Sequence, residues 1–321
     1  MRGLRPYRRV PMYESVFHTP VMVQEVLGYL VTRADGVYVD ATLGGGGHAE
    51  AILQKLGAKG KLIGLDADAD AIAEAGKRLK PYGKQAVLVN ENFRSLNAVL
   101  AAQGYQNVLG VLFDLGVSSF QLDESSKGFS FRGDERLDMR MDRSQPLDAQ
   151  AVVNSYDEQQ LADIIWKYGE EKNGRRIARA ITRIRGRHTI ETTGQLADVI
   201  ESVVGNRFVT KSLARVFQAI RIEVNNELEN LRQALLEAVE TVERHGRIVV
   251  ISYHSLEDRI VKQTFKTAAA TSIPSGSKLL PDTPVEPRIA VITKKPVLPA
   301  SQEQSNNPRA RSAKLRAAER L

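Results

Sequence analysis

The sequence contains no cysteine among its 321 residues. Disulfides, thiolate metal sites, iron–sulfur clusters and thiol catalysis are therefore excluded, and no metal site is expected. No apolar run approaches the roughly 18 residues that a membrane span needs. The basic N-terminus also lacks the apolar core of a secretory signal. We therefore expect a cytoplasmic protein without a membrane partner.

Positive charge is unevenly distributed along the chain. The net charge is +7, and it is concentrated in residues 1–10, 171–188 and 305–321. Cationic ends and a cationic helix beside a nearly neutral body favour a polyanionic partner such as a nucleic acid. Solvated surface and fraying termini are the other interpretation of these runs. An anionic membrane is disfavoured, because the basic segments lack interleaved large apolar side chains.

The first third of the chain alternates short apolar strands with helical patterns. Apolar residues make up 42% of the chain, and the length suits about two domains, or one with a large insertion. This alternation predicts a parallel sheet with helices on both faces. The strands are expected at 37–40, 61–66, 86–89 and 108–114, and the helices at 48–56, 68–80 and 94–103.

The alternation stops after the fourth predicted strand. Residues 123–148 are polar and irregular, and the patterns after them are helical, ending in a long apolar-periodic stretch over 213–242. Strand character returns at 247–252 and 288–293. A helical block therefore interrupts the sheet, which resumes behind it.

This organisation predicts an α/β fold with a mostly parallel, doubly wound sheet and an inserted all-helical domain. The sheet domain is expected to be discontinuous, with residues 1–122 and 218–321, and the insertion to comprise 123–217. Residues 267–287 and 298–312 are rich in Ser, Pro, Thr and Asn. They are expected to be loops or a mobile tail.

A glycine-rich loop follows the first predicted strand. The run Asp40-Ala-Thr-Leu-Gly-Gly-Gly-Gly-His48 contains the dinucleotide-binding pattern G-x-G-x-x-A. Asp66 ends the next strand, where a carboxylate can accept both hydroxyls of a ribose. Successive glycines let a ligand approach the backbone closely. The alternative, a glycine turn that binds nothing, is disfavoured by the combined spacing of strand, glycines, helix and acid.

The acids near this loop discriminate between ligands. NAD carries a pyrophosphate, which Asp40 would repel. S-adenosylmethionine carries an ammonium, a sulfonium and a ribose, and Asp40, Asp66 and Asp114 at the carboxyl edge of the sheet suit these groups. His48 can hydrogen-bond a carboxylate or satisfy its own helix start. Phe93 can contact adenine or belong to the core.

Several short motifs, taken in order, resemble one family. The order and spacing from about residue 14 to the C-terminus resemble the bacterial small-subunit ribosomal RNA cytosine-N4 methyltransferases, the RsmH or MraW family. The motifs are His18-Thr-Pro-Val21, the loop Asp40–His48, Asp114-Leu-Gly-Val-Ser-Ser119, Gln121-Leu-Asp123, Gly128-Phe-Ser-Phe131, Leu137-Asp-Met-Arg-Met-Asp142, Tyr168-Gly-Glu-Glu171, Ser252-Tyr-His-Ser-Leu-Glu-Asp258 and Asn307-Pro-Arg-Ala-Arg-Ser-Ala-Lys-Leu-Arg316.

The resemblance implies a Rossmann-like class I methyltransferase with a helical insertion. It implies that S-adenosylmethionine is the cofactor, and that the partner is the small ribosomal subunit, with a 16S rRNA cytosine in the P site of the decoding centre as substrate. By motif position it implies cofactor contacts from Gly46, Gly47, His48, Asp66, Phe93, Asp114 and Gln121. A monomer and a homodimer are both compatible with the sequence.

Two residues are candidates for the chemistry. The lone pair of the N4 amine of cytosine is delocalised into the ring, so it must be freed and aligned with the methyl group. Asp114 is placed to accept hydrogen bonds from that amine. His254 is a second candidate, as acceptor or proton relay. A structural hydrogen bond within its own turn is an equally good interpretation of His254.

Charged segments outside the loop are candidates for RNA binding. Arg132, Asp138 and Arg140 are candidates for an ion-pair network that shapes the substrate cleft, and a solvated loop is the alternative. The basic helix over 174–187 and the tail are expected to contact phosphates without reading sequence. The tail candidates are Arg309, Arg311, Lys314 and Arg316.

Three other functions compete with this interpretation. A DNA amino-methyltransferase usually has a Pro-Pro-aromatic tetrad where this chain has Asp114-Leu-Gly-Val. A ribosome assembly factor with a vestigial methyltransferase activity is the alternative from a different class, and the intact loop with Asp66 and Asp114 argues against it. A nicotinamide oxidoreductase is disfavoured by Asp40.

Overall fold

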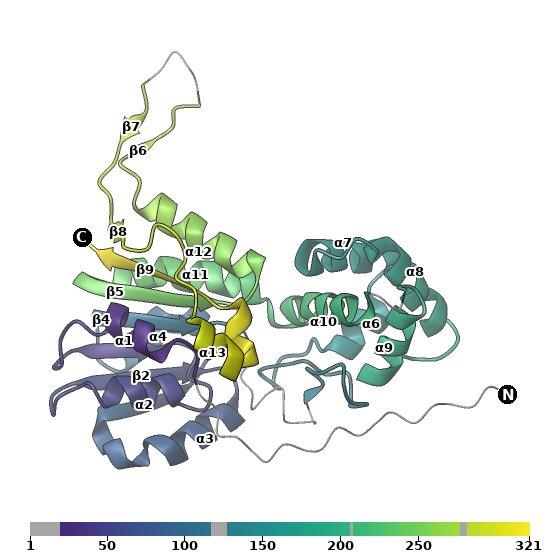
Figure 1. Ribbon diagram of the computed structural model, residues 1–321, viewed down its shortest axis with the longest axis horizontal. Coiled ribbons are helices and arrows are strands. Elements are labelled where there is room, and N and C mark those ends of the chain that lie inside the picture. The colour runs from purple at the N-terminus through teal and green to yellow at the C-terminus, as the bar shows by residue number, and fades with distance from the viewer. Residues whose placement is uncertain (1–19, 117–126, 206–207, 277–280) are drawn as a thin grey trace.

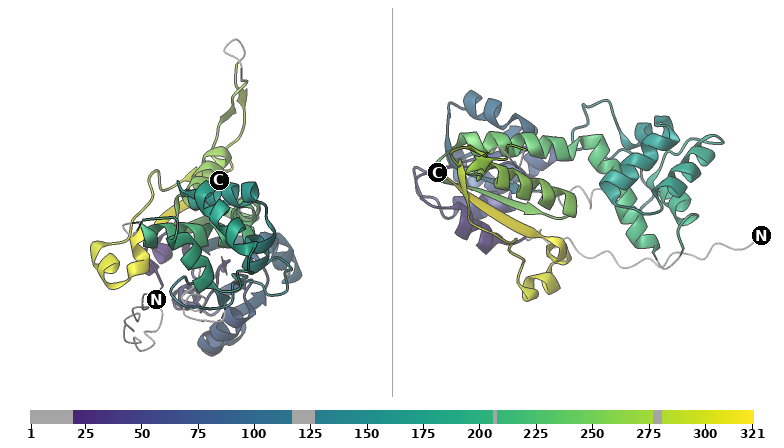
Figure 2. Two further views of the ribbon diagram at one scale, coloured as in Figure 1. Left: turned by 90° about the vertical axis from the view of Figure 1, so that its right-hand side faces the viewer. Right: turned by 90° about the horizontal axis from the view of Figure 1, so that it is seen from above.

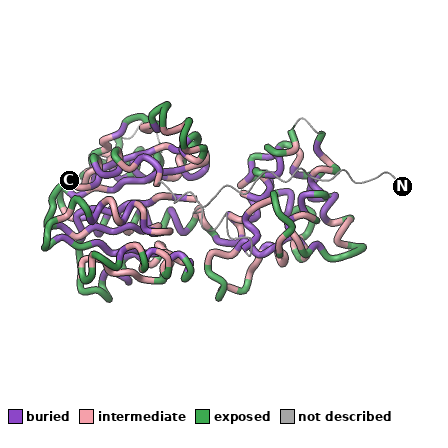
Figure 3. Tube along the Cα trace, turned by 60° about the horizontal axis from the view of Figure 1, so that its bottom comes forward, coloured by how far each residue is buried: buried purple, intermediate pink, exposed green. Residues whose placement is uncertain are grey.

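The computed structural model describes residues 20–116, 127–205, 208–276 and 281–321. Within these residues the chain forms an α/β body and a helical body, which lie next to each other (Figures 1 and 2). Buried residues fill the sheet of the first body and the facing sides of the helices in the second (Figure 3). No helix in the described ranges has both the length and the apolar character that crossing a membrane requires.

The α/β body is built on one seven-stranded sheet with the order β3-β2-β1-β4-β5-β9-β8. Neighbouring strands from β3 to β5 pair in parallel, and β9 lies antiparallel between β5 and β8. The mostly parallel sheet is as predicted. The strands are β1 Val37–Asp40, β2 Lys61–Asp66, β3 Ala86–Asn90, β4 Val108–Asp114, β5 Val242–Ser252, β8 Ile289–Val291 and β9 Lys314–Arg320.

Helices cover both faces of this sheet. One face packs on α4 Leu96–Ala102, α11 Glu227–Thr241 and α12 Ser255–Ala268, and the other on α1 Val23–Leu30, α2 Gly47–Leu53 and α3 Ala69–Leu79. Short 3₁₀ helices, η1 Lys80–Gln85 and η2 Phe93–Ser95, flank β3. The strand order reverses between β1 and β4, so the carboxyl ends of these strands form the crevice where open α/β sheets bind ligands.

The helical body has a hydrophobic core of its own, with buried residues from Phe129 to Val224. The predicted boundary at residue 217 falls inside α10, which continues to Asn225 and contributes Ile220 and Val224 to that core. Asn226, with a φ of 49°, separates α10 from α11. The helices are α6 Ala149–Ser155, α7 Glu158–Gly169, α8 Gly174–Arg185, α9 Thr193–Glu201 and α10 Val209–Asn225.

The prediction of a mobile C-terminal tail is wrong. Residues 298–312 contain α13 Ser301–Asn306 and the 3₁₀ helix η4 Pro308–Ser312, and β9 is an interior strand of the sheet. Arg316 lies on β9 with 7% of its surface exposed, and its guanidinium binds the Asp258 carboxylate at 2.7 Å. The charged residues of β9 do not read as an interior strand in the sequence, because Arg316 is neutralised by Asp258, which is distant in sequence.

The segment 267–287 is also not entirely loop. β6 Ser272–Ile273 and β7 Thr283–Pro284 pair antiparallel, and they form an arm that projects from the α/β body beyond α12 (Figure 1). The side chain of Ile273 on this arm is largely exposed.

Arg316→Ala is expected to lower the free energy of unfolding by about 1.5–3 kcal/mol, the usual contribution of hydrogen bonds to a charged group. The change leaves Asp258 without its closest cation. Lys314→Ala is the matched control on the same strand, since its ammonium lies 3.9 Å from Asp258 and is half-exposed. Urea unfolding of both variants tests this, and similar values for both would contradict it.

Candidate active site

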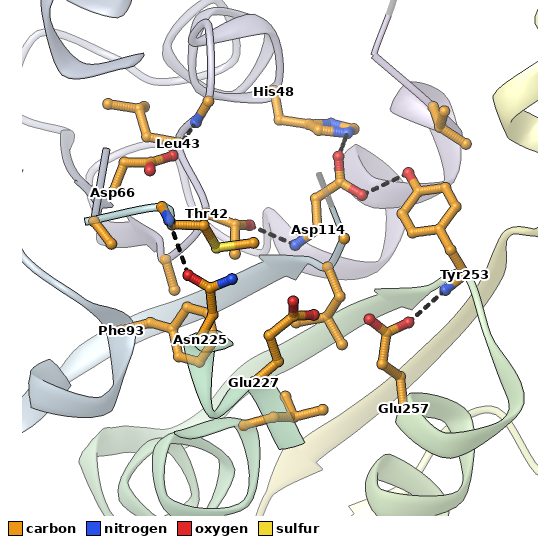
Figure 4. A pocket seen from close by; sticks show the side chains of 18 of the residues that line it. Thr42, Leu43, His48, Asp66, Phe93, Asp114, Asn225, Glu227, Tyr253 and Glu257 are labelled. Carbon is orange, nitrogen blue, oxygen red and sulfur yellow. Dashed lines mark hydrogen bonds and ion pairs between the residues drawn. The ribbon is translucent and has the colours of Figure 1, made fainter. Parts of the chain in front are cut away.

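A cavity of about 330 Å³ lies at the crevice, between the carboxyl ends of the strands and the helical body (Figure 4). It combines residues from the glycine loop, the ends of β2 and β4, the turn after β5, and the junction of α10 with α11. The polar residues that line it include Thr42, His48, Asp66, Arg78, Asn92, Asp114, Gln218, Arg221, Asn225, Glu227, Asn230, Tyr253, His254, Glu257, Arg309 and Ser312.

The glycine loop forms the wall of the cavity nearest α2. Gly44 and Gly46 have φ values of 50° and 77°, which side chains other than glycine rarely adopt. The Gly44 N–H donates to Asp66 Oδ2 at 2.8 Å, so the loop is tied to the end of β2. Gly47 lines the cavity, whereas Gly46 faces Ala75 of α3 and does not. Gly46 thus turns the loop, and the cofactor contact predicted for it stays a prediction.

Asp66 and Phe93 define one end of the cavity. The Asp66 carboxylate accepts hydrogen bonds from the N–H groups of Gly44 and Asp68, and burial raises its pKa to about 6. Phe93 begins η2 and meets Phe113 edge to face, with ring centroids 6.0 Å apart. A carboxylate beside a pocket-lining ring suits a ribose joined to a flat base.

Asp114 is held at the opposite side of the cavity by three contacts. Its N–H donates to Thr42 Oγ1 at 2.6 Å, its Oδ1 accepts from the Tyr253 hydroxyl at 2.7 Å, and its Oδ2 lies 3.3 Å from His48 Nε2 (Figure 4). Each carboxylate oxygen can accept more than one hydrogen bond, so Asp114 retains acceptor capacity toward the cavity.

The partners of Asp114 are themselves perturbed by it. Burial acts to lower the pKa of His48, but the hydrogen bond and charge of Asp114 outweigh burial and raise it. Burial, followed by the charge of Asp114, raises the pKa of Tyr253 well above its ordinary value, so its hydroxyl remains a donor. Gly116 makes room for the Tyr253 ring, since a Cβ there would lie 3.3 Å from the ring.

Asp40 does not line the cavity, and the cofactor contact predicted for it stays a prediction. It is the last residue of β1 and has 1% of its surface exposed. Its Oδ1 accepts from the Thr42 N–H at 3.2 Å, and its Oδ2 has no partner among the described residues. Burial raises its pKa to about 7, although the nearby His48 acts to lower this pKa. Asp40 is as buried as the two apolar residues directly before it in β1, and its position in the sequence did not indicate this burial.

Asp40→Asn is expected to stabilise the protein at pH 8 and to have little effect near pH 4. The ordinary pKa of the carboxyl is 3.8, whereas the buried group titrates near pH 7. Because the pKa is higher by about three in the folded state, ionising Asp40 destabilises the folded state by on the order of 4 kcal/mol. This destabilisation accumulates as the pH rises from about 4 to 7. Asparagine removes the charge and keeps the shape. Urea unfolding at both pH values tests this, and equal effects at both would contradict it.

His254 lines the cavity, but its ring is engaged in its own turn. It caps α12, with Nδ1 accepting from the Glu257 N–H at 3.4 Å and Nε2 lying 3.1 Å from Glu257 Oε1. Glu257 Oε2 in turn accepts from the Tyr253 N–H at 2.8 Å. These contacts fit the structural interpretation of His254, a hydrogen bond within its own turn. Through Glu257 they also position Tyr253.

A polar wall from the α10–α11 junction faces Asp114. Arg221 binds Glu227 through two hydrogen bonds of 2.7 and 2.9 Å. Asn225 accepts from the Met141 N–H and donates to the Met139 carbonyl, each at 2.8 Å. Glu227, His254 and Glu257 come within 4.8 Å of one another, and each already has a protein partner.

This wall and Tyr253 were not predicted from the sequence. Gln218, Arg221 and Asn225 recur at helical spacing within an otherwise apolar pattern, and that interruption was a usable signal. Tyr253 gave a weaker signal, because a tyrosine beside a candidate histidine is also an ordinary core residue.

The residues predicted to bind substrate are scattered. The Arg140 guanidinium binds the Asp138 carboxylate at 2.7 and 2.9 Å and fixes a turn of the helical body, and neither residue lines the cavity. Arg132 is exposed and also does not line it. Arg309 lines the cavity, while Arg311 donates to the Gln304 carbonyl. Gln121 lies outside the described residues.

The cavity fits S-adenosylmethionine by the chemistry of its groups. Asp66 and Phe93 would hold ribose and adenine. His48 Nδ1 is buried and has no hydrogen-bond partner in the described part of the chain, so it suits a polar group such as the carboxylate of the cofactor. Asp114 supplies negative charge near a cationic sulfonium.

A family model and curated relatives identify one family. Residues 15–321 match the family described as the MraW methylase family. A protein from Carboxydothermus hydrogenoformans named ribosomal RNA small subunit methyltransferase H is 49% identical over 306 residues, 95% of this chain and 98% of that protein. A protein of the same name from Clostridium botulinum is 45% identical over 311 residues, 95% of this chain and 99% of that protein. A solved rRNA methylase from Streptococcus thermophilus has a TM-score of 0.42 and 11% identity, with 93% of each chain covered.

Proposed function

Because the chain belongs to the MraW methylase family, we propose that it methylates the N4 amine of a cytosine in the decoding centre of small-subunit 16S rRNA. It is a methyltransferase, and its cofactor is S-adenosylmethionine. The observation that carries the proposed reaction is the Asp114 carboxylate, oriented by Tyr253 and His48 between the cofactor end of the cavity and the polar wall. A ribosomal RNA substrate places this activity in the cytoplasm.

The residues of the chain perform three tasks in this reaction. Asp66, Phe93 and the loop orient the cofactor, which supplies an electrophilic methyl group when bound. Asp114 accepts a hydrogen bond from the N4 amine, which frees its lone pair to form the new N–C bond as the S–C bond breaks. The nitrogen becomes acidic once methylated, and its proton passes to Asp114 or to water.

The helical body and Arg309 complete the substrate side. The cytosine must leave its stack to reach the cavity. Glu227 lines the cavity with carboxylate oxygens, acceptors of the kind that recognise the amine on the edge of a cytosine, and Asn225 beside it is held in place by its bonds to Met139 and Met141. Arg309 lines the cavity near Tyr253, where its charge suits the phosphate of the inserted nucleotide.

Transfer of a tritiated methyl group tests the proposed function. Small subunits lacking the modification and naked 16S rRNA are incubated with the labelled cofactor, and the RNA is digested to nucleosides. The expected product is N4-methylcytidine, formed at one position. Label in another nucleoside would overturn the proposed atom and base, and binding of subunits without transfer would favour the assembly-factor function.

A further inference from the structure

The exposed face of α12 carries a stripe of cations. Arg259, Lys262 and Lys266 are exposed, and their spacing of three and four residues puts them on one face of the helix. They span about 10 Å along the helix axis. The acids of the same helix do not balance them, since Glu257 is buried and Asp258 binds Arg316. Lys262 and Lys266 have no ion pair within the described ranges.

This stripe begins at the cavity. Ser255, the first residue of α12, follows His254, which lines the cavity. Ser255 donates from its hydroxyl to Glu170 at 2.9 Å, and Arg259 binds the same carboxylate at 3.2 Å. Glu170 directly follows α7 in the helical body, so the start of α12 lies against that body close to the cavity mouth.

The basic helix α8 begins just beyond this contact. Lys172, Arg175 and Arg176 lie at its start and are exposed, and its first turn contains no acid. Glu170, between the end of α7 and the start of α8, is the carboxylate that pairs with Arg259 of α12. Its ion pair with Arg259 is solvent-exposed on both sides, so it contributes little and can yield to another anion.

We propose that the stripe of Arg259, Lys262 and Lys266 binds the phosphates of the RNA strand on one side of the inserted cytosine, with α8 continuing this surface across the domain junction. The inference rests on the proposed function. A nucleotide inserted in the cavity draws its neighbouring phosphates to the cavity mouth, where this stripe begins. Lys262 and Lys266, without an ion pair in the described part of the chain, and Arg259, whose pair with Glu170 is solvent-exposed, match a phosphate backbone, which they bind with release of counterions.

The test is the salt dependence of RNA binding by the triple variant Arg259→Ala/Lys262→Ala/Lys266→Ala. Affinity for unmodified small subunits and for naked 16S rRNA is measured from 50 to 300 mM salt. The log–log slope should become shallower by about 2 units, since each single-strand phosphate contact contributes about 0.7. Affinity for S-adenosylhomocysteine and the melting temperature should remain at the parent values, because the three side chains are exposed.

The matched control is Lys55→Ala/Lys59→Ala/Lys84→Ala, which removes the same charge from exposed positions near α2 and η1, on the opposite face of the sheet. It should retain the parent slope. Equal slopes for the parent and the triple variant would overturn the proposed RNA-binding surface. An equal decrease of the slope in the triple variant and the control would overturn it too. A change with subunits but not with naked rRNA would overturn RNA as the partner and indicate a ribosomal protein. If the variant slope falls but the parent transfers no methyl group to cytosine, the surface stands and the proposed function is wrong.

Discussion

Asp114→Asn is expected to slow methyl transfer by about 100- to 10,000-fold, the usual contribution of a positioned proton acceptor. The amide is the same size as the carboxylate. Its oxygen can still accept a hydrogen bond from Tyr253 or from the substrate amine, but this bond is weaker than one to a charged carboxylate. The amide nitrogen is a hydrogen-bond donor, and it would face a second donor, either the substrate amine or the Tyr253 hydroxyl. The loss should therefore fall on the transfer step.

Single-turnover kinetics at saturating cofactor separate this step from binding. The dissociation constant of S-adenosylhomocysteine is measured in parallel, because Asp114 lines the same cavity as the cofactor residues. Asp163→Asn, on the exposed face of α7, is the control and should transfer at the parent rate. A cofactor-saturated Asp114→Asn variant with the parent rate would exclude Asp114 from the chemistry.

Tyr253→Phe examines the support of Asp114 without removing it. The phenyl ring keeps its packing over Gly116, and only the 2.7 Å hydrogen bond to Asp114 is lost. The transfer rate should fall less than in Asp114→Asn. Because the ring and its packing are retained, a transfer rate at the parent value would mean that the hydrogen bond to Asp114 does not contribute to the reaction.

The parallel part of the fold could be predicted because its signals are local. Each strand from β1 to β4 is a short apolar run with a helical pattern behind it, and the structure places all four close to the predicted bounds. The acids at the ends of β2 and β4 follow from the same rule, because parallel strands end at one edge. Asp66 and Asp114 therefore meet at one cavity, although they are distant in sequence.

The elements that were missed depend on partners distant in sequence. Nothing near Arg316 indicates that Asp258 will neutralise it within a sheet. The predicted boundary at residue 217 falls inside α10, because apolar periodicity runs from α10 into α11 and only the backbone of Asn226 interrupts it. The same limitation applies to Asp40, since burial is a property of the assembled sheet.

Asp66→Ala is expected to weaken cofactor binding about 10- to 150-fold, which corresponds to about 1.5–3 kcal/mol for hydrogen bonds to a charged group. The carboxylate is the residue of the cavity best placed for a ribose diol, and it also anchors Gly44 of the loop. Calorimetric titration with S-adenosylhomocysteine measures the effect. Asp70→Ala is the control, because this nearby carboxylate binds Lys127 and does not line the cavity.

The pH dependence of the same titration distinguishes the carboxylate from a merely structural loop anchor. Burial raises the pKa of Asp66 to about 6, so acidification through that value protonates the group and removes its charge. If the ionised form holds the ribose, the affinity of the parent should fall as the pH drops from 7 to 5, and the gap between parent and Asp66→Ala should narrow. Both proteins share the other titrating groups of the cavity, so the gap reports on Asp66 alone. A gap that stays constant over this range would mean that the charge of Asp66 does not contribute to cofactor binding, and that the residue acts by shaping the loop.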